Sequence, residues 1–473
     1  MPLILSGNVA SATAGAYDVA NSCRFNDGDS PHMEKTHGTS TDVDKCTISV
    51  WVKRSALGGT KSIFGYHTDD NNRGSLVFEA DQLDLYINDS GSVTTRLVTT
   101  QVFRDVSAWY HIVLSVDTGQ GTAASRVRLY VNGSEITDFG TETNPDQNLN
   151  FGLNNSSIDG KVGQKGENND YFDGYMAEFV FIDGLQLTPS SFGEFDSDSP
   201  TIWKPKDVSG LTFGTNGFYL DFEDSANLGN DANGGTDLTE TNLAAADQAT
   251  DTPTNNFATL NSIAQWDTGG SHVFSEGNLK AVLSSDLGKA SSTIGVTAGK
   301  WYMEIKQTAE NVPLGNSEGI IGVIGDPIYT TSNWSGWTNG FVMVNQSGYA
   351  YTGASSASSW HGNWSVGDII GVALDMDNMK VYFSKGGQWV DGSGNWDESS
   401  PNAYLTLSSS YSTYFLALSH SHNTATETFE ANFGSPSFAI SSGNADADGY
   451  GNFEYAVPSG YYALCTKNLA EYG

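Results

Sequence analysis

Apolar and polar positions alternate with a period of two through much of residues 47–183, in short segments bounded by Gly, Asn or Asp. This pattern is typical of half-buried antiparallel strands joined by tight turns. Asn132-Gly133 predicts a hairpin, because both residues accept the positive φ of a primed turn. Thr188-Pro189 predicts the start of a short helical patch over 188–195. The expected strands include 47–53, 74–79, 83–87, 109–116, 127–131 and 174–182.

A second alternating region follows a stretch of different composition. Residues 196–265 are rich in Asp, Asn, Gly and Thr around one apolar run at 217–222, which predicts an extended acidic connector with a single strand. Alternation then resumes at 300–305, 319–324 and 367–375, and 380–389 completes a strand, turn, strand unit. The fold prediction is all-β: two antiparallel β-sandwiches, or jelly rolls, joined by that connector. The predicted parts are an N-terminal arm or docking segment (1–40), a first sandwich (41–195), the connector (196–265), a second sandwich (266–435) and a C-terminal segment (436–473).

Charge narrows the classes of partner. The 473 residues hold 22 Lys and Arg against 55 Asp and Glu, a net charge of −33. So acidic a surface repels phosphate backbones and anionic lipids. The sequence therefore predicts that the protein does not bind nucleic acid and does not insert into a membrane. No Lys or Arg lies between Lys206 and Lys280, where eleven acids fall, so the acidity is partly a property of the connector.

The chain start and the cysteines bear on where the protein folds. Met1 to Ser6 has neither the cationic region nor the apolar length of a signal peptide, so we expect folding where the chain is made. Three cysteines are too few for a disulfide framework, which predicts buried free thiols. A bridge between Cys23 and Cys46 stays open as the alternative.

Two ordered sets of motifs resemble known families. Ser49 to Lys53, Trp109-Tyr110-His111, Leu129 to Gly133 and Phe172 to Phe179 resemble, in that order, the laminin-G-like, concanavalin-type jelly roll. The resemblance implies two packed sheets and recognition of glycan or protein at one face or rim. Gly367 to Asp375 followed by Lys380 to Trp389 resembles the SPRY domain, with Gly386-Gly387 where that family usually has Asn-Gly.

The order of these parts resembles virion appendage proteins, of the tail-fibre type, of marine bacteriophages. That resemblance implies a place in the virion, assembly in the host cytoplasm, and other virion proteins and a host-surface glycan or protein as partners. Because fibres are built from symmetric copies, we expect a homo-oligomer, with a homotrimer as the specific guess.

Calcium is the cofactor that the sequence favours, because Asp, Asn and backbone carbonyls on loops supply hard oxygen ligands. The predicted site joins Asp69 and Asp70 to Asp170 and Asp173, and ordinary turn roles for these residues are the alternative. A second cluster, Asn26 to Asp29, has the same composition.

Exposed indoles stack on sugar rings, so tryptophans in the second sandwich are the predicted glycan contacts. The alternative is that they fill the core, the role that we assign to Trp51 and Trp109. His420 and His422 lie two apart on an expected strand, where a surface pair is a simpler explanation than zinc. The predicted stacking residues are Trp334, Trp337, Trp360 and Trp364.

Enzymatic chemistry finds little support. The closest match to the Glu-x-Asp-x-Glu of glucanases is Glu194 to Asp198, which ends in Asp and falls in the expected connector. No nucleophile elbow, phosphate loop or His-Glu-x-x-His occurs. We therefore predict a non-enzymatic protein. The alternative is a polysaccharide depolymerase, which requires two carboxyls about 5 to 9.5 Å apart in an open groove.

Overall fold

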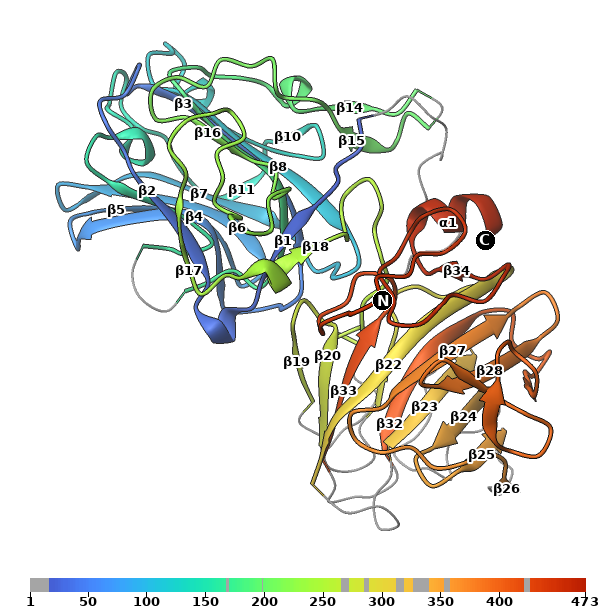
Figure 1. The fold of residues 1–473 in the computed structure, drawn as a ribbon. Helices are drawn as coiled ribbons and strands as arrows, with labels where there is room; N and C mark the ends of the chain where they lie inside the picture. The colour runs from blue at the N-terminus through green and yellow to red at the C-terminus, as the bar shows by residue number, and fades with distance from the viewer. Residues whose placement is uncertain are drawn as a thin grey trace. The chain divides into compact units, whose positions relative to one another are not determined.

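The computed structural model describes residues 17–166, 170–197, 199–264, 272–284, 289–311, 319–325, 340–352, 358–420 and 426–473. The chain divides into two compact units, the first ending at Thr254 and the second beginning at Asn255 (Figure 1). Both consist of largely antiparallel sheets with very little helix, so the all-β prediction is confirmed.

The first unit contains two sheets of eight strands each. One has the order β10-β9-β8-β3-β13-β1-β18, with β16 also paired to β13, and the other has the order β11-β7-β6-β5-β4-β12-β2-β17. The strands of this unit are β1 (Ser22–Phe25), β2 (His32–Thr36), β3 (Lys45–Arg54), β4 (Thr60–Asp69), β5 (Asn72–Glu79), β6 (Gln82–Asp89), β7 (Ser92–Val102), β8 (Trp109–Asp117), β9 (Val127–Val131), β10 (Ser134–Ile136), β11 (Phe139–Thr143), β12 (Asp159–Val162), β13 (Gly174–Asp183), β14 (Gly193–Phe195), β15 (Trp203–Pro205), β16 (Phe218–Leu220), β17 (Thr239–Thr241) and β18 (Gln248–Ala249).

The inward positions of both sheets form one apolar core. On β6, Leu83, Leu85 and Ile87 are buried in it, so the alternate positions of that strand face outward. The predicted hairpin is confirmed: Asn132 (φ 48°) and Gly133 (φ 78°) form the turn between β9 and β10.

The predicted extended connector is wrong for most of its length. Residues 196–254, here called the covering segment, fold onto the outer face of the sheet that holds β3, β8 and β13 (Figure 1). Its strand β16 pairs with β13, β18 pairs with β1, and β17 pairs with β2 of the other sheet. Its side chains Phe213 and Tyr219 pack on Val113 and Val180, and every residue of β13 is buried as a result.

Three acids of the covering segment form ion pairs with cations of the sandwich. Asp247 lies 3.7 Å from Arg24 of β1, Asp231 lies 3.6 Å from Lys35 of β2, and Asp251 lies 2.7 Å from Lys53 of β3. Residues 207–254 of this segment contain no Lys or Arg, and such a stretch resembles a solvated linker in sequence. Here three of its acids pair with cations that are distant along the chain, in addition to the strand pairing and the apolar packing.

Two boundaries also differ from prediction. Residues 1–16 of the predicted arm lie outside the described residues, but residues 22–36 form β1 and β2, with Cys23, Phe25 and Met33 in the core. The expected helical patch over 188–195 is a single 3₁₀ turn, Pro189–Ser191, followed directly by β14.

The second unit contains a ten-stranded and a six-stranded sheet. The orders are β19-β20-β33-β22-β27-β28-β29-β30, with β31 paired to β28 and β34 to β22, and β21-β32-β23-β24-β25-β26. The elements are β19 (Val273–Ser275), β20 (Lys280–Ser284), β21 (Lys289–Ser291), β22 (Lys300–Glu310), β23 (Gly319–Gly325), β24 (Phe341–Asn345), β25 (Tyr349–Thr352), β26 (Ser358–Ser359), β27 (Ile369–Asp375), β28 (Lys380–Lys385), β29 (Gln388–Val390), β30 (Trp396–Glu398), β31 (Leu405–Thr406), β32 (Tyr414–His420), β33 (Thr426–Asn432), β34 (Tyr462–Ala463) and α1 (Thr466–Tyr472).

Predictions for this unit are met in part. Gly386 (φ 59°) and Gly387 (φ 78°) form the turn between β28 and β29, as a primed turn requires. The C-terminal segment is part of the sandwich, since β34 pairs in parallel with β22. All three cysteines are buried and free, as predicted. Among the described residues, the helices are all too short to cross a membrane.

Candidate ligand-binding site

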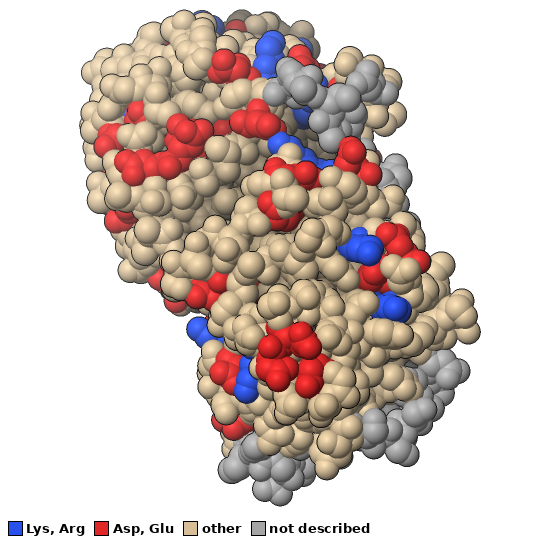
Figure 2. Space-filling model, turned by 45° about the vertical axis from the view of Figure 1, so that its right-hand side comes forward, with Lys and Arg blue, Asp and Glu red and all other residues tan. Residues whose placement is uncertain are grey.

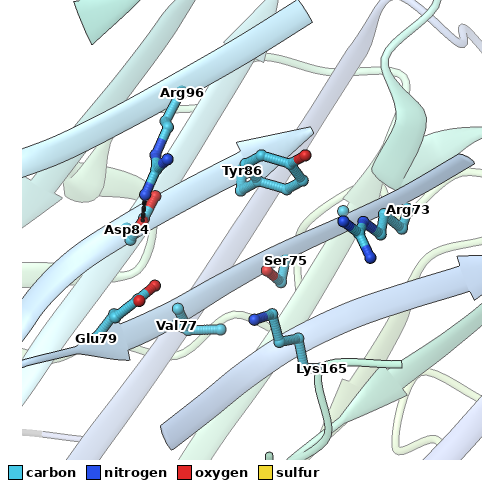
Figure 3. A pocket seen from close by; sticks show the side chains of 9 residues that line it. Arg73, Ser75, Val77, Glu79, Asp84, Tyr86, Arg96 and Lys165 are labelled. Atoms are coloured by element: carbon cyan, nitrogen blue, oxygen red, sulfur yellow. Dashed lines mark hydrogen bonds and ion pairs between the residues drawn. The ribbon is translucent and has the colours of Figure 1, made fainter. Parts of the chain in front are cut away.

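The outer face of β5, β6 and β7 carries a hollow of about 290 Å³. Each of these strands turns one set of alternate residues to the core and the other set to this face, here called the open face. The volume is at the small end of the range for small-molecule sites. The residues lining the hollow are Arg73, Gly74, Ser75, Val77, Glu79, Asp84, Tyr86, Arg96 and Lys165 (Figure 3).

Strand register sets the floor of this pocket. Ser75 of β5 lies opposite Tyr86 of β6, which lies opposite Arg96 of β7, so one row of side chains crosses three strands. Val77 and Asp84 form the next row. Because the register is fixed by the core side of the same strands, these side chains are held on a rigid surface.

Lys165 reaches the pocket from the loop between β12 and β13. A Cβ on Gly65 of β4 would lie 2.6 Å from the carbonyl oxygen of Lys165, so only glycine lets this loop lie directly on the strand. In Figure 3 the Lys165 amine points toward Ser75 and Val77. The ammonium is 3.4 Å from Asp170.

Asp84 and Arg96 form the most buried charged pair of the pocket. Arg96 Nη2 donates to Asp84 Oδ2 at 2.9 Å, and Asp84 is only 3% exposed. Burial raises the pKa of Asp84, and the hydrogen bond from Arg96 opposes that rise. Within the described part of the chain, Asp84 Oδ1 and Arg96 Nε have no hydrogen-bond partner. The pair therefore retains one acceptor and one donor, and leaving such groups buried and unsatisfied costs about 1–3 kcal/mol each.

Tyr86 supplies the aromatic surface. The guanidinium carbons of Arg73 and Arg96 lie 5.9 and 5.8 Å from its ring centroid. Contacts at this distance from a ring face are favourable for cations. The ring is held in place while remaining partly exposed toward the pocket.

The predicted calcium ligands do not form one group. Asp69 accepts from the Asn71 amide at 2.8 Å in the β4 to β5 turn, Asp70 is mostly exposed there, and Asp170 pairs with Lys165. Asp173 is buried beside Asp27. Burial is the main cause, and the neighbouring carboxyl of Asp27 the second, that raises the pKa of Asp173 to about 8. Among the described residues, no three His, Cys, Asp or Glu side chains are grouped to hold a metal. Calcium stays a prediction.

The predicted tryptophans fall into three groups. Trp334 and Trp337 lie outside the described residues. Trp364 is 1% exposed and donates to Gln307 Oε1 at 2.9 Å, so its assignment to glycan stacking is corrected to a core role. Trp360 is half-buried and packs edge-on against Phe383. Trp51 and Trp109 are buried as predicted, under the covering segment.

The remaining motifs, the carboxylates at 194–198 and the histidines at 420 and 422, do not form a site among the described residues. Glu194 lies on β14, which pairs with β15, and Lys204 lies 3.6 Å from Glu194 and 3.4 Å from Asp196. A strand therefore lies where a linker was expected. Lys204 is close to both acids, so the two carboxylates are paired with a lysine and do not face an open groove together. Asp198 and His422 lie outside the described residues.

Sequence reasoning missed the pocket. The sequence does contain an alternating pattern here. Leu76 and Phe78 point to the core, and the residues at the alternate positions of the same strand point to the other face: Arg73, Ser75, Val77 and Glu79. Each residue singly has the composition of an ordinary exposed strand face. The register of three strands and the close loop at Lys165 are needed to see that they converge.

Comparison with known proteins confirms both sandwich resemblances. Residues 27–190 match the family model of the concanavalin A-like lectin/glucanases superfamily, and residues 300–434 match the model of the SPRY domain. The chain therefore carries one domain of each kind. None of the curated proteins matches the chain.

Solved structures show likeness at low identity. The SPRY domain of human HERC1 is 17% identical, with a TM-score of 0.27, over 34% of this chain and 96% of that chain. A SAP-like pentraxin from Limulus polyphemus is 20% identical, with a TM-score of 0.27, over 37% and 80%. Domain 4 of an extracellular arabinanase from Geobacillus stearothermophilus, in complex with arabinotriose, is 18% identical, with a TM-score of 0.26, over 38% and 82%. TM-scores this low carry no argument about function.

Proposed function

We propose that this protein is a non-enzymatic carbohydrate-binding protein and that the pocket on β5, β6 and β7 holds the saccharide. The observation that carries the proposal is the set of groups that the pocket combines. Tyr86 offers a ring for a sugar face, Asp84 Oδ1 offers an acceptor for a hydroxyl, and Arg96 offers a donor. Sugars present this alternation of apolar faces and hydroxyls.

The test is titration calorimetry of the full chain with a panel of neutral and acidic oligosaccharides. Loss of the Tyr86 ring should weaken binding about tenfold, since a stacking contact of this kind contributes on the order of 1 kcal/mol or more. Tyr404→Ala is the matched control, because Tyr404 is 45% exposed and lies outside the pocket. Equal weakening by both variants, or no binding by any saccharide, would contradict the proposal.

The biological setting that we propose is the virion of a bacteriophage, in which the protein contacts other virion proteins and attaches to a host-surface glycan or protein. The resemblance of the domain order to appendage proteins supports this setting. A homotrimer follows from the symmetry expected of fibres. Immunogold labelling of purified particles tests the location, and particles without label would refute it. Sedimentation equilibrium of the purified chain tests the trimer.

A polysaccharide depolymerase is the second candidate, and one observation favours it. Glu79 and Asp84 line the same pocket from adjacent strands, as diagonal neighbours in the register. Both side chains leave the same face of the sheet, and the Glu79 carboxylate contributes to the raised pKa of Asp84, so the two carboxyl groups are close enough to interact. The raised pKa of Asp84 is also the direction that an acid catalyst needs. Release of reducing ends from a bound polysaccharide, abolished by Glu79→Gln, would establish this candidate over simple binding.

A further inference from the structure

We infer that the covering segment is held on the sandwich by a pH-sensitive contact, in which a neutral Glu178 side chain joins Tyr17 to Tyr219 and its ionisation loosens the segment. Glu178 lies on β13, Tyr219 lies on β16 of the covering segment, and Tyr17 precedes β1. The pocket on β5, β6 and β7 belongs to the other sheet. The inference is therefore independent of what that pocket binds.

The three side chains form one hydrogen-bonded cluster. The Tyr219 hydroxyl donates to Glu178 Oε2 at 2.8 Å, and the Tyr17 hydroxyl donates to the same oxygen at 3.1 Å. The two hydroxyl oxygens are 3.0 Å apart. Glu178 is 5% exposed and Tyr219 is 7% exposed. The cluster thus connects three segments that are distant along the chain, at a point that water reaches poorly.

The backbone at Glu178 is unusual for a strand. Its φ is 50°, a value that residues other than glycine adopt rarely. The register between β13 and β3 shifts between Ala177 and Val180, so Glu178 lies in a β-bulge. Bulges redirect side chains, and this one directs a carboxyl group to the two hydroxyls. Backbone strain that is retained at a buried acid indicates a function for that acid.

The partners of Glu178 suit a neutral carboxyl group. A tyrosine hydroxyl can donate or accept, so the cluster remains satisfied when Glu178 is protonated and donates its own proton. In the described part of the chain, no Lys, Arg or His forms an ion pair with Glu178. When the carboxyl ionises, its buried charge therefore has only the two hydroxyls to stabilise it.

Glu304 of the second unit provides a comparison. It is fully buried on β22 and accepts from the backbone amides of Glu454 and Tyr455 at 2.9 and 2.8 Å. Backbone amides can only donate, so they favour the carboxylate and oppose the rise in pKa that burial causes at Glu304. Glu178 has no backbone donor in its cluster. The two buried glutamates are thus built for different protonation states.

The surrounding charges also favour the neutral form of Glu178. Asp221 and Glu223 of the covering segment both raise its pKa, and Asp207 raises the pKa of Tyr17. The net charge of the chain is −33, and acidic side chains outnumber basic ones on the face drawn in Figure 2. One more negative charge is unfavourable in such surroundings.

The direction of the pH effect follows from these contacts. Burial is the main cause that raises the pKa of Glu178 from 4.5 to about 7, and the hydrogen bonds from Tyr219 and Tyr17 oppose the rise. Burial raises the pKa of both tyrosines as well, so their hydroxyls keep their protons over this range. The contact is therefore fully stabilising below about pH 4.5 and weakens as the pH rises through 7.

Hydrogen exchange of the full chain at pH 5 and pH 8 tests the inference, with the parent compared to Glu178→Gln. In peptides of the covering segment, the opening constant of the parent divided by that of the variant should rise on the order of fiftyfold between the two pH values. His111 of the same sheet has the opposite pH dependence, but it is present in both proteins and cancels in the ratio. A ratio that does not change with pH would overturn the inference.

A matched control and a second element show whether the effect is specific. Glu194→Gln changes an exposed acid of β14 and should follow the parent at both pH values. Peptides of β6, in the other sheet, should show no pH-dependent difference between the parent and Glu178→Gln. An equal change in those peptides would mean that the whole unit unfolds, which would contradict a contact specific to the covering segment.

Tyr219→Phe provides a second variant that does not depend on the folding of Glu178→Gln. It keeps the ring and removes the stronger donor to Glu178. Because a hydrogen bond to a charged acceptor is stronger than one to a neutral group, the loss of protection in the covering segment should be larger at pH 8 than at pH 5. Equal losses at both pH values would show that Glu178 does not change its protonation state, against the inference.

Discussion

The two sheets of the first unit share one core but differ on their outer faces. The outer face of β3, β8 and β13, here called the covered face, lies under the covering segment, and β3 and β13 are buried almost throughout. On the open face, β7 alternates between buried and accessible residues and the pocket lies across its neighbours. Antiparallel sheets commonly keep one face in water, and in this unit the polar pocket lies on that face.

The difference shows how stability and binding are divided. Charges on the covered face are used internally: Asp251 accepts from Lys53 Nζ at 2.7 Å and from Trp109 Nε1 at 3.1 Å, with both charged side chains 1% exposed. On the open face, Asp84 and Arg96 retain unsatisfied atoms. A substitution on the covered face should therefore change stability, and one on the open face should change binding.

The largest expected effect comes from Asp251→Ala. Removing this carboxylate leaves the Lys53 ammonium buried without its counterion, which should lower the free energy of unfolding by about 3–5 kcal/mol. Urea unfolding followed by hydrogen exchange in peptides of residues 17–254 measures it. Glu223→Ala, at an exposed acid of the same segment, should change it by less than about 0.5 kcal/mol. Equal effects would mean that the covering segment is not docked.

Gly133→Ala should have the next largest effect. Gly133 has φ 78°, and an added Cβ would lie 2.6 Å from the ring of Trp203 in the covering segment. Backbone strain at such a φ costs roughly 1–2 kcal/mol, and displacing Trp203 adds to it. Gly58→Ala, at φ 70° with no atom near the added Cβ, measures the strain by itself. In urea unfolding, Gly133→Ala should lower the free energy of unfolding more than Gly58→Ala does. Equal losses in the two variants would contradict the Trp203 contact.

Acid should weaken the covered face through His111. This ring accepts from Trp203 Nε1 at 2.9 Å, and burial lowers its pKa to about 3. The unfolded chain takes up a proton near pH 6.5 and the folded chain does not, so stability falls as the pH drops below 6.5, by about 1.4 kcal/mol per pH unit. Between pH 7 and pH 5, His111→Gln should reduce the loss of stability by about 2 kcal/mol. An unchanged pH profile in urea unfolding would show that His111 is protonated in the fold.

The smallest effect on stability is expected from Tyr86→Ala on the open face. The ring is partly exposed, so its loss should lower the free energy of unfolding by about 1 kcal/mol or less. The same variant is expected to weaken saccharide binding about tenfold. Thermal unfolding and calorimetry on one preparation give both values. A large loss of stability with unchanged affinity would reverse the roles assigned to the two faces.

How far the sequence predicted this structure depends on the range of the interaction. The strands over 47–53, 109–116 and 174–182 and the Asn132-Gly133 turn were predictable, because alternation and turn chemistry are local. The covering segment was predicted as a connector because it is rich in Asp, Asn, Gly and Thr around a single apolar run. Its partners Arg24, Lys35 and Lys53 are about 200 residues earlier in the chain, where no local pattern relates them.

The sequence by itself determined the all-β class, the two sandwich domains and the free cysteines, because each depends on periodicity, composition and short motifs. The tertiary structure decided which sheet face is covered and which is open. It also moved Trp364 into the core and brought Arg73, Asp84, Arg96 and Lys165 to one pocket. The physical reason is that burial and convergence depend on strand register and on contacts between distant segments, and a single strand of alternating residues carries neither.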